Sequence, residues 1–345
     1  SFRLREPKTP VQIRASPLTS IIEYFKYEQL LLLIMTFKSK YNALLKNVSV
    51  KRWYENISAG SKITADVYLR TLGLFSELNN TDPDKIVTMA KENPRKFKDD
   101  FMDFVRLLEK QGKAGSYIAR FKRVIRSWLK FNELEIKIDV KIRGESESPR
   151  IINERVPSKE ELASIIRKAS SRGRVAIALM AFSGLRPESL GNYDGTDGIR
   201  LGDFKELNLE TLEFEKSPTI LLVRSSLSKV RHQYFTFVPE EGITYIKEYL
   251  RERKNKGEKF SYDIPLLSLE EKGKRSHNLL RTLLITREVR EAMNLAGFIA
   301  RPYVLRVYFA TALDIAESKG LISHPWRMFI MGHKGDIEAR YSTNK

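Results

Sequence analysis

The helical pattern of this chain breaks off between residues 135 and 155, and this break limits the possible folds more than any other feature. The segment mixes charged residues with glycine, serine and proline, and its apolar residues follow no lasting period. Such a composition is typical of a connection between two domains. With 345 residues, the chain is also long enough to build two hydrophobic cores. We therefore predict a helical domain at 58–135, a linker at 136–155 and a second domain at 156–345.

The part of the chain before the break is predicted to be helical. Residues 1–57 form an extension in this interpretation, with one hydrophobic helix from about Ser20 to Lys46 that is apolar on more than one face. The extension can be given no task from its sequence. After it, Ser61 is a candidate cap for a helix with a long apolar run, because its hydroxyl can accept a hydrogen bond from a free backbone amide.

The most informative helix of this part spans residues 116–130, because it is both amphipathic and basic. Its apolar residues fall on one face at helical spacing, and they are Ile118, Phe121, Val124, Ile125, Trp128 and Leu129. Its basic residues occupy the remaining surface, and they are Arg120, Lys122, Arg123, Arg126 and Lys130. A basic face is often simply solvated. In a chain with an overall basic charge, the pattern favours a helix that lies on nucleic-acid phosphates.

Charge and cysteine content narrow the possible functions. The 61 lysines and arginines exceed the 43 acidic residues, which gives a formal net charge of +18 and a polyanionic partner as the first expectation. The chain has no cysteine, which excludes disulfides, thiol catalysis and cysteine-ligated zinc or iron–sulfur sites. Only four histidines are present, so a histidine-rich metal centre is not expected either. No apolar run approaches the length of about 20 residues that a membrane-spanning helix needs.

The second domain is predicted to begin with a helix and to contain a small sheet. Ser158 and Glu161 have the spacing of a capping box, and the later helix at 175–182 is almost entirely apolar and so should be buried. Three short strands follow, at about 209–215, 220–224 and 234–238. The last two form a hairpin whose polar turn contains Lys229, and from Gly242 onwards the pattern is helical again.

Three motifs in this domain hold residues that could carry chemistry. The first is SGLR at 183–186, where the buried helix ends and Arg186 follows at once. The second is RPYVLRVYFAT at 301–311, in which Tyr303 and Arg306 lie one helical turn apart. The third is Gly332-His333, followed eight residues after the histidine by Tyr341. Each motif alone is weak, since such arginines are often structural and such tyrosines often lie on the surface.

Taken in order, with a hairpin lysine between the first two, the motifs resemble the catalytic domain of the tyrosine recombinase family, particularly archaeal and phage-type integrases. The family box Thr-Gly-Leu-Arg is similar to 183–186, and the box Thr-Pro-His-x-Leu-Arg-His-x-Phe-Ala-Thr is similar to 301–311. The basic helical segment looks like the family's core-binding domain, so the resemblance covers about 58–345. It implies a fold that is mainly α with a small antiparallel β-sheet, in which a helical core-binding domain precedes an α+β catalytic domain.

The resemblance also implies DNA strand breakage and rejoining through a 3′-phosphotyrosyl intermediate. Tyr341 is then the expected nucleophile, while Arg186 and Arg306 bind the non-bridging oxygens of the scissile phosphate. His333 adds a third donor, and Lys229 is the expected general acid for the departing 5′-oxygen. The phosphotyrosyl bond stores the energy of the broken bond, so no ATP, metal or other cofactor is expected.

The chain departs from the family pattern at two places. Tyr303 stands where the family usually has a histidine, and a phenol can hold a phosphate oxygen but is a poor base near neutral pH. Tyr341 lies one residue closer to His333 than is usual, which leaves open a nucleophile beyond the last residue given. The general acid is also less firmly assigned than the arginines, because Lys216, Arg231 and His232 lie near Lys229.

We therefore predict a site-specific recombinase or integrase whose partner is double-stranded DNA with a specific recombination site. It is expected to act as a homo-tetramer on DNA, to be a monomer free in solution, to have no membrane partner, and to work on DNA in the cytoplasm of its host cell. One alternative is an enzyme like the type IB topoisomerases, which uses the same intermediate to relax supercoils. The other is a non-catalytic DNA-binding protein of the same fold.

Overall fold

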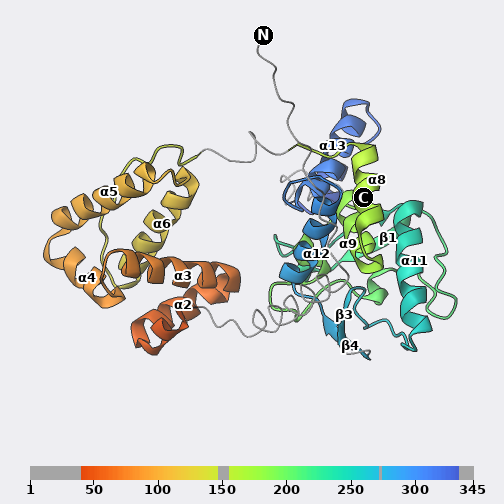
Figure 1. Cartoon of the computed structure of the whole chain (residues 1–345), viewed down its shortest axis with the longest axis horizontal. Coiled ribbons are helices and arrows are strands. Elements are labelled where there is room, and N and C mark those ends of the chain that lie inside the picture. The colour runs from red at the N-terminus through yellow and green to blue at the C-terminus, as the bar shows by residue number, and fades with distance from the viewer. Residues whose placement is uncertain (1–39, 147–154, 272–273, 334–345) are drawn as a thin grey trace, which may run out of the picture. The chain divides into compact units, whose positions relative to one another are not determined.

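The structure is a computed structural model that describes residues 40–146, 155–271 and 274–333 (Figure 1). The side chains of residues 270–278 are not described. The chain divides into two compact units, at 1–148 and 149–345, each with its own hydrophobic core. The fold is mainly α with small antiparallel sheets, which confirms the predicted fold class.

The N-terminal unit is a set of helices whose starts are fixed by polar caps. Asn47, Ser61, Asp82 and Asn93 each accept hydrogen bonds from backbone amides of the helix that follows, and this satisfies donors that the helix itself leaves unpaired. Ser61 is the cap that the sequence predicts. The elements are η1 (Asn42–Lys46), α2 (Val48–Gly60), α3 (Lys62–Leu78), α4 (Pro83–Glu92), α5 (Pro94–Lys110) and α6 (Gly115–Phe131).

The helical unit begins earlier than residue 58, the boundary that the sequence suggests. Trp53 on α2 is 1% exposed, and its indole Nε1 donates to Ser127 Oγ on α6 at 3.1 Å. Helix α2 therefore belongs to the core and not to an extension. Of the predicted hydrophobic helix Ser20–Lys46, the described part is the short 3-10 helix η1, and the rest lies outside the described residues.

The predicted linker at 136–155 is also shorter than expected. Ile138, Val140 and Ile142 are buried in the core of the N-terminal unit. Charged residues alternate with these three, so the segment looks like a solvated connection although every second side chain faces the core. Only residues 147–154 lie outside the described part of this segment.

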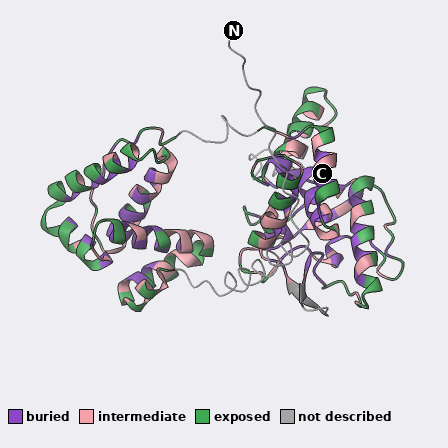
Figure 2. Cartoon of the chain, viewed as in Figure 1, coloured by how far each residue is buried: buried purple, intermediate pink, exposed green. Residues whose placement is uncertain are grey.

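The C-terminal unit is organised around α9, which is buried on nearly all sides and packs against α8, α11, α12 and α13 (Figure 2). The capping box predicted at Ser158 and Glu161 is present at the start of α8. The helices are α8 (Lys159–Lys168), α9 (Ser171–Ala181), α10 (Pro187–Leu190), α11 (Glu240–Asn255), α12 (Thr282–Leu295), α13 (Val304–Ser318) and α14 (His324–Ile330), with 3-10 turns η2 (Leu201–Asp203) and η3 (Ser225–Leu227).

Two antiparallel hairpins complete this unit. The predicted hairpin is confirmed as β1 (Thr219–Val223) and β2 (Tyr234–Val238), in which Val223 pairs with Tyr234. The strand predicted at 209–215 is wrong, because Leu212 has a φ of 60° in the left-handed region and the segment turns back on itself. The helical prediction from Gly242 onwards is wrong at one place, where β3 (Ser268–Glu271) pairs with β4 (Lys274–Leu279).

Candidate active site

The end of α9 holds Arg186 in a fixed position. Gly184 has a φ of 65°, which a residue with a side chain rarely adopts. A Cβ at Gly184 would also lie 2.2 Å from Phe309 Cδ1, so α13 packs directly on this turn. Arg186 then occupies the position just before α10, with Pro187 in the first helical position. The turn predicted from the SGLR motif is therefore built as the sequence suggests, and Arg186 is half-buried at its edge.

Arg306 lies in the first turn of α13 and joins three separate segments. Its side chain is buried, with 1% of the residue exposed. Its Nη1 donates to the carbonyl of Gly184, and its Nη2 donates to the carbonyl of Met331. The same Nη2 lies 3.4 Å from His333 Nε2. The structure thus brings together the arginine of the second motif, the turn of the first and the loop of the third.

Arg186 contacts the same loop, because its Nη1 donates to the Gly332 carbonyl at 3.4 Å. No carboxylate of a described residue lies within ion-pair distance of Arg186 or Arg306, so both are held by main-chain carbonyl dipoles. Burial lowers the pKa of Arg306, and the positive charge of Arg186 lowers it further. Two cations are therefore held close together with no described counter-charge, which is an arrangement that favours an anion.

His333 completes the group, with its imidazole half-buried beside Arg306. Burial lowers the pKa of His333, and the charges of Arg306, Arg186 and Arg327 lower it further. The ring is therefore neutral at neutral pH and can donate one hydrogen bond. The neutral imidazole of His333 can therefore donate a hydrogen bond beside the two arginines without adding a third positive charge.

Tyr303 occupies the cap position of α13 and is 36% exposed. Its phenol interacts with Arg306 and partly offsets the lowering of the pKa of that guanidinium. The structure therefore places Tyr303 next to the arginine pair, as the shared helical face in the sequence suggests.

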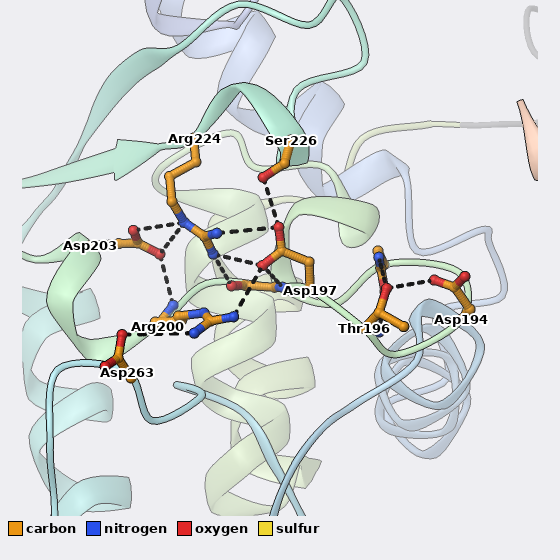
Figure 3. A network of polar contacts seen from close by, with 10 residues as sticks. Asp194, Thr196, Asp197, Arg200, Asp203, Arg224, Ser226 and Asp263 are labelled. Atoms are coloured by element: carbon orange, nitrogen blue, oxygen red, sulfur yellow. Dashed lines mark hydrogen bonds and ion pairs between the residues drawn. The ribbon is translucent and has the colours of Figure 1, made fainter. Parts of the chain in front are cut away.

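Lys229 lies on the exposed loop between β1 and β2, and no contact among the described residues joins it to the arginines. The start of this loop is nevertheless fixed (Figure 3). Arg224 Nε donates to Asp203 Oδ1 at 3.1 Å and Arg224 Nη2 donates to Asp197 Oδ1 at 2.9 Å. Ser226 Oγ donates to Asp197 Oδ2 at 2.7 Å. The loop that carries the predicted general acid is thus anchored at its first residues, Arg224 and Ser226.

The carboxylates of Asp197 and Asp203, which hold the start of this loop, have opposite pKa shifts. Burial raises the pKa of Asp203 and outweighs its hydrogen bonds with Arg200 and Arg224. Burial would also raise the pKa of Asp197, but hydrogen bonds from Ser226, Arg224 and Gly198 outweigh it and the pKa is lowered. Of the two carboxylates that pair with Arg224, Asp197 is therefore the stronger acid.

Tyr341, the predicted nucleophile, lies outside the described residues. The chain before it is described as far as His333, which is in contact with Arg306. The assignment of Tyr341 as the nucleophile therefore remains a prediction from the sequence.

Tyr234, at the start of β2, is a residue of this site that the sequence interpretation missed. It is 2% exposed, and burial raises its pKa while the charges of Arg306 and Arg186 act in the opposite direction. A Cβ at Gly332 would lie 2.5 Å from Tyr234 Cζ, so the phenol lies directly under the third motif. The burial of Tyr234 could have been predicted only from the correct register of the strand, because buried and half-buried residues alternate along it from Tyr234 onwards.

The basic helix predicted at 116–130 is α6, and its five basic residues have different surroundings. Arg123, Arg126 and Lys130 are exposed. Arg120 stacks on the Tyr117 ring at 4.8 Å from the ring centroid. Lys122 is used inside the unit, because its Nζ donates to the Val140 carbonyl at 3.0 Å. The exposed basic face is therefore narrower than the sequence suggests.

Two features are absent from the described residues. No group of three or more His, Asp or Glu side chains in the described part is arranged to hold a metal ion. Within the same residues, no helix combines the length and the apolar character that crossing a bilayer requires.

Comparison with known proteins identifies the fold. No protein-family model and no curated protein sequence matches the chain. Among solved structures, the chain is similar to the XerH site-specific recombinase bound to its difH substrate before cleavage, with a TM-score of 0.52 and 16% identity over 84% of this chain and 80% of that one. XerA recombinase also matches, with a TM-score of 0.39 and 20% identity over 85% of this chain and 92% of that one. The likeness to XerH shows that the chain has the fold of a tyrosine recombinase.

Proposed function

We propose that this chain is a site-specific DNA recombinase or integrase that cuts and rejoins DNA through a 3′-phosphotyrosyl intermediate. The observation that carries the proposal is the meeting of Arg186, Arg306 and His333, which come from three distant segments and have no described counter-charge. The fold shared with XerH, a recombinase whose structure contains its DNA substrate, supports the same function.

In the proposed reaction, Tyr341 Oη attacks the phosphorus of a DNA phosphodiester. A bond forms between the tyrosine oxygen and phosphorus as the phenolic proton passes to solvent, and the bond between phosphorus and the 5′-oxygen breaks. The leaving oxygen takes a proton from Lys229 and becomes a free 5′-hydroxyl. Attack by the 5′-hydroxyl of another strand reverses these steps and rejoins the DNA, so the cycle uses neither ATP nor a metal ion.

The two arginines have different parts in this proposal. Arg186 is half-buried and meets the phosphate with its exposed edge. Arg306 is 1% exposed and its Nη2 donates to the Met331 carbonyl, so we propose that a phosphate oxygen binds this guanidinium by replacing that carbonyl. Guanidinium groups suit both places, because they remain charged and bind two oxygens in a forked arrangement. His333 and Tyr303 add neutral donors beside them.

Lys229 must move inwards to serve as the general acid. Its side chain is exposed on the loop. The start of the loop is held by the ion pairs between Arg224 and the carboxylates of Asp197 and Asp203. The proposed motion is therefore limited to the tip of the loop, which DNA would draw towards the phosphate.

The proposed partner is double-stranded DNA, bound in part by the exposed basic face of α6. Arg123, Arg126 and Lys130 lie at positions that share one side of this helix. Strand exchange between two DNA sites requires four active sites, so we propose a homo-tetramer on DNA that dissociates to monomers in its absence.

Covalent capture tests the catalytic part of the proposal. The full chain is incubated with a library of nicked duplexes of random sequence, and adducts that resist denaturing detergent are isolated and sequenced. We expect adducts with the wild type and none with Tyr341→Phe. An adduct in Tyr341→Phe would show that another residue is the nucleophile. DNA binding without any wild-type adduct would indicate a non-catalytic DNA-binding protein.

The captured duplex then separates recombination from relaxation. Two copies of the captured site on one plasmid should yield recombinant products. Relaxation of a supercoiled plasmid without exchange would favour an enzyme like the type IB topoisomerases.

The salt dependence of DNA binding tests the α6 face. Arg126→Gln removes one proposed phosphate contact, and it should reduce the slope of log K against log salt by about 0.9. Lys91→Gln is the control, because Lys91 is also an exposed basic residue but lies on α4. Equal slopes in Arg126→Gln and the wild type would exclude this face.

A further inference from the structure

Tyr234 and Arg306 each have a buried polar atom without a hydrogen-bond partner in the described part of the chain. These atoms are the phenol Oη of Tyr234 and the guanidinium Nε of Arg306. The phenol oxygen can accept a hydrogen bond and the Nε–H can only donate one. The two side chains are close enough for both the charge and the hydrogen-bonding groups of Arg306 to act on the pKa of Tyr234, against the effect of burial. An unpaired polar atom in the interior costs free energy, so such a pair calls for an explanation.

The surroundings of the phenol leave it little freedom to move away. Tyr234 is 2% exposed and is fixed in the hairpin by its pairing with Val223. The main chain of Gly332 passes so close that a Cβ there would lie 2.9 Å from Tyr234 Oη. Ser189 is close enough to the hydroxyl to lower the pKa of Tyr234, although its own Oγ donates to the Leu227 carbonyl at 3.1 Å. The phenol therefore has a fixed position beside a guanidinium that also contacts the carbonyls of Gly184 and Met331 and the ring of His333.

We propose that Tyr234 is a positioning residue for the reaction and acts through Arg306. When a phosphate oxygen replaces the Met331 carbonyl on Arg306 Nη2, the guanidinium turns and its Nε–H donates to Tyr234 Oη. The hydroxyl then holds the guanidinium in the orientation that binds the developing charge on the phosphate. This inference rests on the proposed function and adds a residue that none of the three sequence motifs contains.

A phenol suits this position better than a carboxylate. A carboxylate would orient Arg306 but would also neutralise it, and it would compete with the phosphate for the same charge. Tyr234 remains neutral because burial raises its pKa. It can therefore accept a hydrogen bond and leave the positive charge of the site available to DNA.

The test compares Tyr234→Phe with Tyr249→Phe on the duplex captured by the wild type. Tyr249 is also a buried tyrosine of the same unit, 1% exposed, but its ring lies beside Arg253. Single-turnover adduct formation is measured at saturating DNA, together with the Kd for DNA and the thermal unfolding midpoint. We expect Tyr234→Phe to lower the rate constant by roughly tenfold to a hundredfold with little change in Kd, as for a lost hydrogen bond to a charged group. Tyr249→Phe should keep the wild-type rate.

A second substrate separates positioning from simple loss of structure. A methylphosphonate at the cleavage position replaces one charged oxygen by a methyl group, so less charge develops for Arg306 to stabilise. The defect of Tyr234→Phe should therefore shrink on this substrate. An equal defect on both substrates, or a wild-type rate on the ordinary duplex, would overturn the inference. A wild type that forms no adduct would instead remove the proposed function, and this inference with it.

Discussion

Two arginines are buried among the described residues of the C-terminal unit, and they have different partners. Arg253 on α11 is 0% exposed, and its Nε donates to Glu258 Oε2 at 2.8 Å. Its Nη1 donates to the carbonyls of Pro265 and Leu266 at 2.9 and 2.7 Å. Arg306 on α13 is 1% exposed, and it contacts carbonyls and a histidine but no described carboxylate.

Arg253 therefore has its counter-charge within the protein, whereas Arg306 has none among the described residues. The carboxylate of Glu258 neutralises Arg253, and the rings of Tyr249 and Phe260 lie 5.4 and 5.3 Å from its guanidinium carbon. Arg306 instead has Arg186 as a charged neighbour, which lowers its pKa. Burying a charge costs free energy unless it is paired, so the Arg306 region is the one that an anion would complete.

The largest expected effect is on stability, in Arg253→Met. The substitution leaves Glu258, whose side chain is 7% exposed, without its partner. We expect the free energy of unfolding to fall by about 3–5 kcal/mol, measured by urea denaturation. The double variant with Glu258→Leu should recover much of this loss. Adduct formation per folded molecule should be unchanged, and a specific loss of activity would break the comparison.

Arg306→Met should have the opposite balance of effects. The rate constant of adduct formation should fall roughly a hundredfold to a thousandfold, as when one donor to a developing oxyanion is removed. The free energy of unfolding should fall by much less than in Arg253→Met, because no described carboxylate is left unpaired. Equal destabilisation in the two variants, measured under the same conditions, would show that both arginines are structural.

The dependence of stability on pH should come partly from the Arg306 region. The pKa of His333 is lowered from 6.5, so between that value and the folded-state pKa the unfolded chain binds more protons than the folded one. The stabilising contribution is thus complete above pH 6.5 and is lost as the pH falls towards the folded-state pKa. Unfolding midpoints measured between pH 8 and 5 should fall less in His333→Gln than in the wild type. A parallel decline in both would assign the effect to other groups.

The smallest expected effect is stabilisation by inorganic phosphate. An anion that binds the arginine pair at a concentration equal to its Kd should add about 0.4 kcal/mol to the free energy of unfolding. The corresponding rise of the unfolding midpoint should persist in Arg253→Met and disappear in Arg306→Met. Sodium chloride at matched ionic strength is the control, and an equal rise in all three proteins would indicate a general salt effect.

The sequence predicts the elements of the two regions better than their contacts. The capping box at Ser158 and the pairing of β1 with β2 follow from local patterns, and the structure contains both. The strand predicted at 209–215 fails because a left-handed residue, Leu212, reverses the chain, and residue type alone gives no sign of this. Helix α2 and the segment 138–142 are misassigned for a different reason, since their apolar residues alternate with or are separated by charged ones.

The same limit applies to the site. Arg186, Arg306 and His333 are predicted because each lies in a short motif, and the structure brings these three together. Arg253 and Tyr234 lie in no motif, and what matters for them is the neighbour that the fold supplies. The pair of Arg253 with Glu258 crosses the end of a helix, and Tyr234 meets Gly332 through the packing of β2 on α14. Such contacts depend on tertiary structure and leave no local pattern.

The hydrogen bond from Arg306 to the Gly184 carbonyl joins positions that are 122 residues apart in the sequence. Phe309 closes over the same turn, and the Met331 carbonyl and His333 come later still in the chain. A polypeptide growing on the ribosome therefore has Arg186 long before it has the partners that make an anion site. Synthesis must pass residue 333 and α13 must dock before the proposed site exists, so a nascent chain that ends earlier lacks the arrangement proposed to bind a DNA phosphate.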